Sequence, residues 1–248
     1  MNLYSTIRRI LNEETQKPKI LEFPSLEFFD NDPFEAWTII QKIIEKKGNP
    51  PYSIGGNLNF LGSPIESLGN LVSVGGYLHL RYSRIKSLGN LQSVGEFLNL
   101  EGTPIESLGN LKSVGEFLDL EKTPIQSLGN LTSVGGYLDL RYSRIKSLRN
   151  LQSVGEDLNL VGTKIDSLGN LKSVGGDLLL QGSEIQSLRN LTTVGGELNL
   201  ILTKINSLGK LNFVGKNLYL QRTPLSNEYT EEQIRKMVDV EGGIYLSV

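Results

Sequence analysis

Hydrophobic and polar positions repeat along this chain with a fixed period. The stretch SVGGYLHLRYSRIKSLGNLQ at 73–92 returns as SVGEFLNLEGTPIESLGNLK at 93–112, so the period is 20 residues without insertion. Leucines occupy the sixth and eighth positions of the units, as at Leu78 and Leu80, except that the first unit has Phe60 at its eighth position, and polar or aromatic residues lie between and beside them. This alternation is typical of a β-strand with one buried face.

The repeat extends over most of the chain. Nine units begin at Ser53, Ser73, Ser93, Ser113, Ser133, Ser153, Ser173, Thr193 and Phe213. Further apolar positions recur in the units, as at Val74, Ile85, Leu88 and Leu91. Prolines and glycines leave no segment inside a unit long enough for a helix. Each unit therefore predicts one coil of a solenoid, made of one short parallel strand, a turn and an irregular return.

The two ends of the chain depart from the repeat and predict caps, which a solenoid needs because its terminal coils would otherwise expose leucines and strand edges. Residues 1–52 predict a helical N-terminal cap. Its first helix places Leu3, Ile7, Ile10 and Leu11 on one face. Its second begins at Asp32-Pro33-Phe34-Glu35 and presents Phe34, Trp37, Ile40 and Ile44 before Gly48 and Pro50 end it.

Residues 227–248 predict the C-terminal cap, which follows the repeats at 53–226. Thr230-Glu231-Glu232-Gln233 is a capping-box pattern that opens a short helix through Met237 and Val238. After two glycines, Ile244-Tyr245-Leu246 imitates one more strand.

Composition excludes several classes of function. The chain has no cysteine and one histidine, His79, which excludes disulfide scaffolds and Cys-ligated metals and leaves little for histidine chemistry. A net charge of -2 gives no sign of the excess positive charge that binds nucleic acid or an anionic membrane. No apolar run is long enough to span a bilayer, and the first residues lack the apolar core of a signal peptide. We expect a soluble, cytoplasmic or virion-associated protein without a cofactor.

The repeat resembles the leucine-rich-repeat family, whose consensus L-x-x-L-x-L-x-x-N-x-L aligns with Gly75-x-x-Leu78-x-Leu80-x-x-Ser83-x-Ile85. Two positions depart from the family: the first leucine is glycine in all nine units, and Ser or Thr replaces the asparagine. A hydroxyl can still bond the backbone at that turn. The VGG-x-L-x-L and SLGNL signatures resemble short repeats in tailed-phage and bacterial proteins. The resemblance implies a mostly β, leucine-rich-repeat-like solenoid.

The outward positions of the expected strand are the candidate binding surface. Tyr77, Phe97, Phe117 and Tyr137 follow one another in the fifth position of four consecutive units. Asp119 and Asp139 lie in the seventh position, and Arg81 and Arg141 in the ninth. Flat apolar anchors beside charged groups are typical of a protein-binding surface. The alternative is an aromatic ladder that only stabilises the sheet.

Three functions remain open on this pattern. The favoured one is a non-catalytic module that binds a protein partner through these eight residues. A virion-associated or surface structural protein that binds a host glycan is the alternative. The third is a glycan-cleaving enzyme using Asp119 with Asp139, or Glu101 with Glu121, as a carboxylate pair one coil apart. An open sheet offers no cleft to raise one pKa, which argues against the enzyme. The oligomeric state is left open.

Three further columns are predicted to be structural. The asparagines from Asn70 to Asn190 are expected to form a buried ladder that satisfies turn amides. The invariant glycines from Gly55 to Gly215 require either a positive φ or a space without a side chain. The column of Gly89 accepts Arg149 and Arg189, so it is expected to be less constrained.

Overall fold

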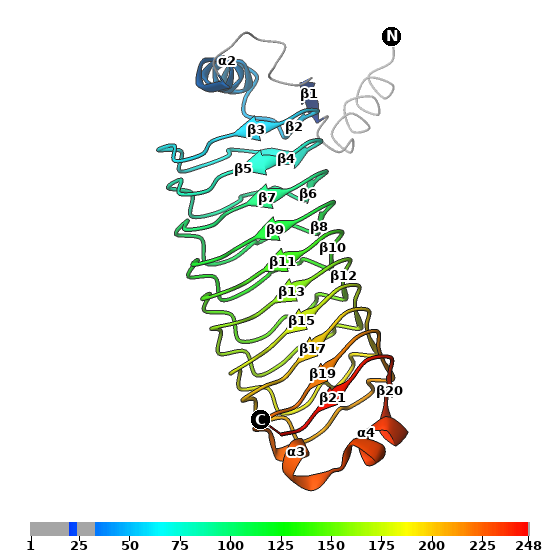
Figure 1. Cartoon of the computed structure of the whole chain (residues 1–248). Coiled ribbons are helices and arrows are strands. Elements are labelled where there is room, and N and C mark those ends of the chain that lie inside the picture. The colour runs from blue at the N-terminus through cyan, green and yellow to red at the C-terminus, as the bar shows by residue number, and fades with distance from the viewer. Residues whose placement is uncertain (1–19, 24–32, 248) are drawn as a thin grey trace, which may run out of the picture.

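The chain folds into a parallel β-solenoid whose 20-residue coils stack along one axis, as the computed structural model in Figure 1 shows. The structure describes residues 20–23 and 33–247. A helix lies near the N-terminus, and two short helices with a final pair of strands lie at the C-terminus. The predicted fold class is therefore confirmed.

Each coil contributes two short strands rather than the single one expected, so the strands form two parallel sheets. The first sheet contains β1 (Leu21–Phe23), β2 (Tyr52–Ile54), β4 (Leu71–Val74), β6 (Ser93–Val94), β8 (Ser113–Val114), β10 (Ser133–Val134), β12 (Ser153–Val154), β14 (Ser173–Val174), β16 (Thr193–Val194), β18 (Phe213–Val214) and β20 (Asp239–Val240). The second contains β3 (Leu58–Asn59), β5 (Leu78–His79), β7 (Leu98–Asn99), β9 (Leu118–Asp119), β11 (Leu138–Asp139), β13 (Leu158–Asn159), β15 (Leu178–Leu179), β17 (Leu198–Asn199), β19 (Leu218–Tyr219) and β21 (Ile244–Tyr245).

The additional strand begins each unit. Ser93 pairs with Ser113, and Val94 with Val114, in exact repeat register. Two residues are too few to show an alternating pattern, and their hydrogen-bond partners lie 20 residues away. The local sequence therefore could not reveal this strand.

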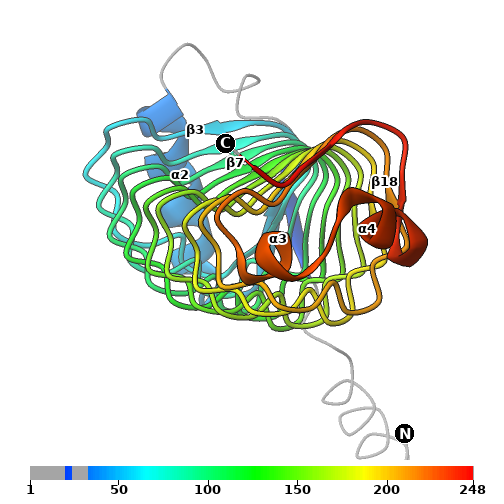
Figure 2. The same cartoon turned by 60° about the horizontal axis from the view of Figure 1, so that its bottom comes forward.

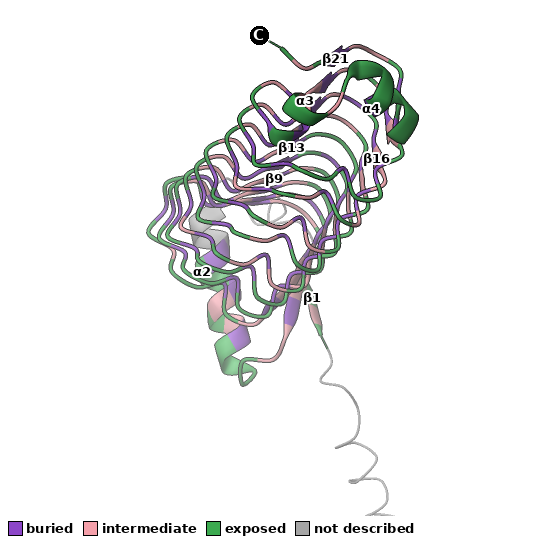
Figure 3. Cartoon of the chain, turned by 90° about the horizontal axis from the view of Figure 1, so that it is seen from below, coloured by how far each residue is buried: buried purple, intermediate pink, exposed green. Residues whose placement is uncertain are grey.

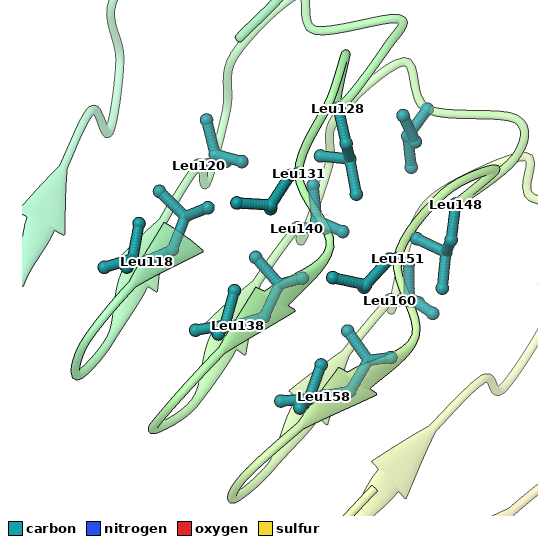
Figure 4. Packing of buried hydrophobic residues seen from close by; sticks show 14 of the residues in the cluster. Leu118, Leu120, Leu128, Leu131, Leu138, Leu140, Leu148, Leu151, Leu158 and Leu160 are labelled. Carbon is teal, nitrogen blue, oxygen red and sulfur yellow. The ribbon is translucent and has the colours of Figure 1, made fainter. Parts of the chain in front are cut away.

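Leucine rows fill the interior of the solenoid. In Figure 4 the side chains of Leu118, Leu138 and Leu158 occupy equivalent positions in successive coils. Each of the three is fully buried. Figure 3 shows that buried positions recur at the same places in successive coils, with exposed positions between them. One coil cannot bury its leucines alone, so the stack forms a single continuous core.

The position that holds Ser or Thr in every unit forms a second buried row. Thr103 is 1% exposed, and its Oγ1 donates a hydrogen bond of 2.7 Å to the Leu100 carbonyl oxygen. This is the backbone bond expected at the turn. Ser83, Ser143 and Ser183 hold the same buried position, but their hydroxyls have no partner among the described residues.

The invariant glycine column exists because the coils leave no space for a side chain. A Cβ on Gly115 would lie 1.8 Å from the carbonyl oxygen of Gly95 in the preceding coil. The described glycines of this column have no positive φ. Of the two explanations that the sequence allowed, lack of space is correct.

The column of Gly89 was predicted to be less constrained than the invariant glycines, but its residues have a positive φ. Gly89 has a φ of 59°, and Arg149 and Arg189 adopt φ values of 44° and 45° in the same place. The turn requires a left-handed residue, which glycine adopts without strain and arginine does not. A serine two residues earlier supports the turn, since the Arg149 amide donates to Ser147 Oγ at 3.3 Å.

The asparagine column was also predicted wrongly, since Asn90 and Asn150 are exposed rather than buried. These side chains lie on the outside of the turn. Their amides bond the preceding coil where they reach it, as Asn150 Nδ2 does to the Gly129 carbonyl oxygen at 3.1 Å.

The N-terminal end of the stack is closed by β1 and by α2 (Pro33–Lys46). The Trp37 ring packs edge-on against Phe60 at 5.0 Å and lies 6.3 Å from the Tyr52 ring. Strand β1, which the sequence did not predict, pairs with β2. The helix predicted around Leu3–Leu11 and the capping residue Asp32 lie outside the described residues.

The C-terminal end carries α3 (Pro224–Glu228) and α4 (Glu231–Met237), which Figure 2 shows in front of the stack. The predicted capping box is present, with Thr230 and Gln233 bonding each other's backbone amides. The predicted final strand is β21, while α3 was not predicted. None of the described helices combines the length and apolar character needed to cross a membrane.

Candidate functional site

Four aromatic side chains form one stack on the outer face of the second sheet. Successive rings in the order Tyr77, Phe97, Phe117, Tyr137 have centroids 4.6, 4.5 and 4.8 Å apart and lie within 7° of parallel. We call this set the aromatic ladder. Its spacing is the coil spacing, because identical positions in neighbouring coils face each other in register. Stacking covers the faces of the inner rings, so the ladder presents ring edges to solvent, and Tyr137 at its end is 38% exposed.

Outside the ladder, the same column has a different role. The side chain of Asn57 accepts a hydrogen bond from the Tyr77 amide at 3.0 Å. Beyond the other end, the carboxylate of Asp157 accepts from the Asp177 amide at 2.7 Å, and that of Asp177 from the Glu197 amide at 2.8 Å. The acidic column that follows the ladder thus bonds the backbone of the next coil. A ring cannot make this bond, so the four central coils exchange it for ring stacking.

The seventh column caps its own strand. Asp119 Oδ1 accepts the Glu121 amide at 3.0 Å, and Asp139 Oδ1 accepts the Arg141 amide at 2.9 Å. Asn99 makes the same bond to the Glu101 amide. A side chain that bonds the backbone two residues ahead forms an Asx turn. Both candidate aspartates therefore shape the turn that follows each strand.

The ninth column forms a row of ion pairs, which we call the ionic row, made of Arg81, Glu101, Glu121 and Arg141. Arg81 Nε lies 2.7 Å from Glu101 Oε2, and Arg141 Nη2 lies 2.7 Å from Glu121 Oε2. Each arginine thus covers the carboxylate of its inner neighbour. The Glu121 pKa is lowered, mainly by the hydrogen bond from Lys122.

Arg141 also holds Asp139, with Nη2 2.6 Å from Oδ2. This contact is the main reason that the Arg141 pKa is raised. Glu101 and Asp139 are only 7% and 8% exposed, although they face outward, because the long side chains around them cover them.

Asp119 forms no ion pair with an arginine among the described residues, in contrast to Glu101, Glu121 and Asp139. Its Oδ2 accepts a hydrogen bond from Asn99 Nδ2 at 3.2 Å. Burial is the main cause that raises its pKa, and the neighbouring carboxylates of Asp139, Glu101 and Glu121 raise it further.

Replacing Asp119 by asparagine is therefore expected to stabilise the fold at pH 7 by about 0.5–1 kcal/mol. A raised folded-state pKa means that stability is lost as the pH rises from the unfolded value, near 3.8, through the folded one. Asparagine keeps the Asx turn, as Asn99 shows, without the charge. Urea unfolding from pH 3 to 7 measures the gain, which should vanish at the acid end. A gain that is equal at pH 3 and pH 7 would contradict the electrostatic explanation.

All eight predicted site residues lie on one face, but they form two groups. The aromatic ladder is one, and the other consists of the ionic row with the two aspartates. His79 lies beside the aromatic ladder, since its ring is edge-on to the Phe97 ring with centroids 6.0 Å apart. Burial is the main cause that lowers its pKa, and Arg81 lowers it further.

Lys122 and Tyr82 were not among the predicted site residues, although both contact the ionic row. Lys122 Nζ lies 2.7 Å from Glu121 Oε1, and Tyr82 Oη donates to Glu101 Oε1 at 2.9 Å. Both occupy left-handed positions with a φ of 57°, where other units have Gly62 or Gly102. Glycine holds this position in four of the nine units and a larger residue in the other five, so the column offered only a weak signal.

Among the residues that the structure describes, no group of three acidic or histidine side chains is arranged to hold a metal ion. Comparisons with protein-family models, curated proteins and solved structures found no match for this chain.

Proposed function

We propose that this protein is a non-catalytic binding module, similar to leucine-rich-repeat proteins, that recognises a protein partner through the aromatic ladder. The observation that carries the proposal is the change within the fifth column. Asn57, Asp157 and Asp177 bond the backbone of the next coil, whereas the four central coils give up that bond and place rings on the open face. If this column served stability alone, a polar residue that bonds the backbone would suffice in the central coils, as it does in the coils beyond both ends of the ladder.

The surroundings of the ladder suit a protein partner. It spans roughly 14 Å, three coil spacings of about 4.8 Å, on a sheet without a covering element among the described residues. Arg81 and Arg141 flank it with heads held in place by glutamates. Aromatic anchors with pre-positioned arginines are enriched in protein interfaces.

A glycan ligand is the second candidate. The observation that favours it is the pair Tyr82 and Tyr142, which are 53% and 59% exposed and add hydroxyl-bearing rings beside the charged groups. The resemblance to phage-type repeats would place such a protein on a virion, whereas a protein-binding module would suit the cytoplasm.

Catalysis is the least supported function. Asp139 is held by Arg141, and Asp119 and Asp139 each accept a backbone amide. We propose that both aspartates are structural. A glycan-cleaving enzyme would lose product release in Asp119→Asn, whereas a binding module would gain stability and keep its affinity.

The ladder is tested with the triple variant Phe97→Ala, Phe117→Ala, Tyr137→Ser. We expect it to remain folded by circular dichroism and to lose at least about tenfold in affinity for peptides that the native protein selects from a display library. The same preparations are applied to a glycan array. Glycan binding that depends on the ladder, without peptide selection, would favour the second candidate.

Tyr219→Ala is the matched control. It removes one ring of the Tyr219–Tyr245 stack, whose centroids are 4.9 Å apart on the same sheet, without touching the ladder. This variant should be less stable, because a stacked ring is lost, yet it should keep the affinity of the native protein for the selected peptides. Unchanged selection by the triple variant would show that the ladder serves only the fold.

A further inference from the structure

A depression opens beside the end of the aromatic ladder, where the chain turns from the first sheet to the second. It has a volume of about 280 Å³, and Glu116, Phe117, Tyr137 and Glu156 line it together with Gly115, Gly135 and Gly136. The fourth position of the unit explains it. Glutamates hold this position in the coils before and after, whereas Gly136 has no side chain to fill the space between them. We call this depression the Gly136 hollow.

The charge of the hollow is negative and not neutralised within the described residues. Glu116 and Glu156 are both exposed, and neither forms an ion pair with a described residue. Elsewhere on this face the carboxylates of Glu101, Glu121 and Asp139 are paired with cations. Burial is the main cause that raises the Tyr137 pKa, and the carboxylates of Asp119, Asp139 and Glu156 raise it further. Arg141 acts in the opposite direction and lowers the Tyr137 pKa.

We propose that the Gly136 hollow binds an arginine or lysine side chain of the protein partner, an inference that rests on the proposed function of the ladder. Such a side chain carries an apolar stem and a cationic head. The stem would pack against Phe117 and Tyr137, and the head would lie between the two carboxylates. Their backbone positions are two coils, about 9.6 Å, apart, so a head group placed over Gly136 is within reach of both.

The geometry disfavours other occupants. Two flexible glutamates at this separation do not form a metal cage, which needs several oxygen ligands within about 2.6 Å of the ion. An anionic group would meet like charges on both sides. A neutral apolar side chain would leave both carboxylates without partners. The hollow thus gives the ladder a charge preference that ring edges alone do not supply.

The test uses the full-length protein and two short probes that differ in charge but hardly in shape. Acetyl-Gly-Arg-Gly-amide carries the cation, and the same peptide with citrulline is its neutral equivalent. Binding is followed through the amide resonance of Gly136, whose N–H donates to the Glu116 carbonyl oxygen at 2.7 Å. We expect saturable shifts with the arginine peptide and at least fivefold weaker binding of the citrulline peptide.

Two variants separate the hollow from general attraction by negative charge. The double variant Glu116→Gln, Glu156→Gln keeps the shape and should bind the arginine peptide at least fivefold more weakly. Gly136→Glu fills the hollow with the residue that neighbouring coils carry and adds a negative charge. It should abolish binding, whereas non-specific attraction predicts tighter binding. Glu96→Gln, in the same column but outside the lining, should bind as the native protein does.

Equal binding of both peptides, or unchanged or tighter binding by Gly136→Glu, would overturn the inference. The outcome is separable from that of the ladder, because Phe97 does not line the hollow. If Phe97→Ala keeps the arginine shift while the triple ladder variant keeps its display selection, the hollow stands and the ladder proposal fails. If display selection depends on the ladder but Gly136→Glu still binds arginine, the ladder stands and the hollow fails.

Discussion

Replacing Gly135 by alanine is expected to destabilise the solenoid by about 3 kcal/mol or more. The new Cβ would lie 1.9 Å from the carbonyl oxygen of Gly115 and 2.8 Å from its carbonyl carbon. Both atoms belong to backbone that cannot move away alone, because the Gly135 amide is bonded to the Val114 carbonyl oxygen at 2.9 Å. The coils would have to separate, which breaks inter-coil hydrogen bonds and opens the leucine core. Urea unfolding followed by circular dichroism measures the loss.

The adjacent residue supplies the control. A Cβ on Gly136 would meet the nearest atoms of Glu116 at 3.0–3.1 Å, a tight contact but far less severe than that at Gly135, and glutamate holds the same position in the coils before and after. Gly136→Ala should therefore cost less than about 1 kcal/mol. Equal losses in the two variants would contradict crowding at Gly135 as the cause, because the effect of alanine on the unfolded chain is to stabilise the fold.

The interior could be predicted from the sequence because burial follows a strict period. Leu98 and Leu100 alternate with polar residues, and the same positions are apolar in every unit, so the inward register was unambiguous. The glycine column was predicted as structural, but its cause was not. Whether Gly115 needs a positive φ or merely space depends on how closely two coils approach, which is a property of the stack.

The candidate site could also be predicted only in part from the sequence. Identical positions 20 residues apart had to face each other, so the stack of Phe97 on Phe117 follows from register. The ionic row did not follow, because a long side chain such as Arg141 reaches carboxylates on its own coil and on the preceding one. The exposure of Asn90 was missed for a related reason. An asparagine between two leucines was expected to point inward, but a left-handed residue precedes it and places the turn outside.

Trp37→Ala is expected to destabilise the first coils by about 3 kcal/mol, a typical cost of truncating a buried tryptophan. Trp37 is 8% exposed, and its ring packs on Phe60. The same helix supports Tyr52, because Gln41 Nε2 donates to Tyr52 Oη, which in turn donates to the Leu68 carbonyl oxygen. Loss of the tryptophan would open the end of the leucine core to water.

The loss should remain local, because each coil of a solenoid contacts only its neighbours and the stability of the stack is a sum of such contacts. Hydrogen exchange is the appropriate measurement. The Leu58 amide, bonded to the Tyr77 carbonyl oxygen, should lose protection, while the Leu198 amide, bonded to the Asn217 carbonyl oxygen, should keep it. Ile39→Ala, on the same helix but 40% exposed, should change neither. Uniform loss of protection along the stack would mean that the coils unfold as one cooperative unit, and that α2 stabilises all of them rather than the end it covers.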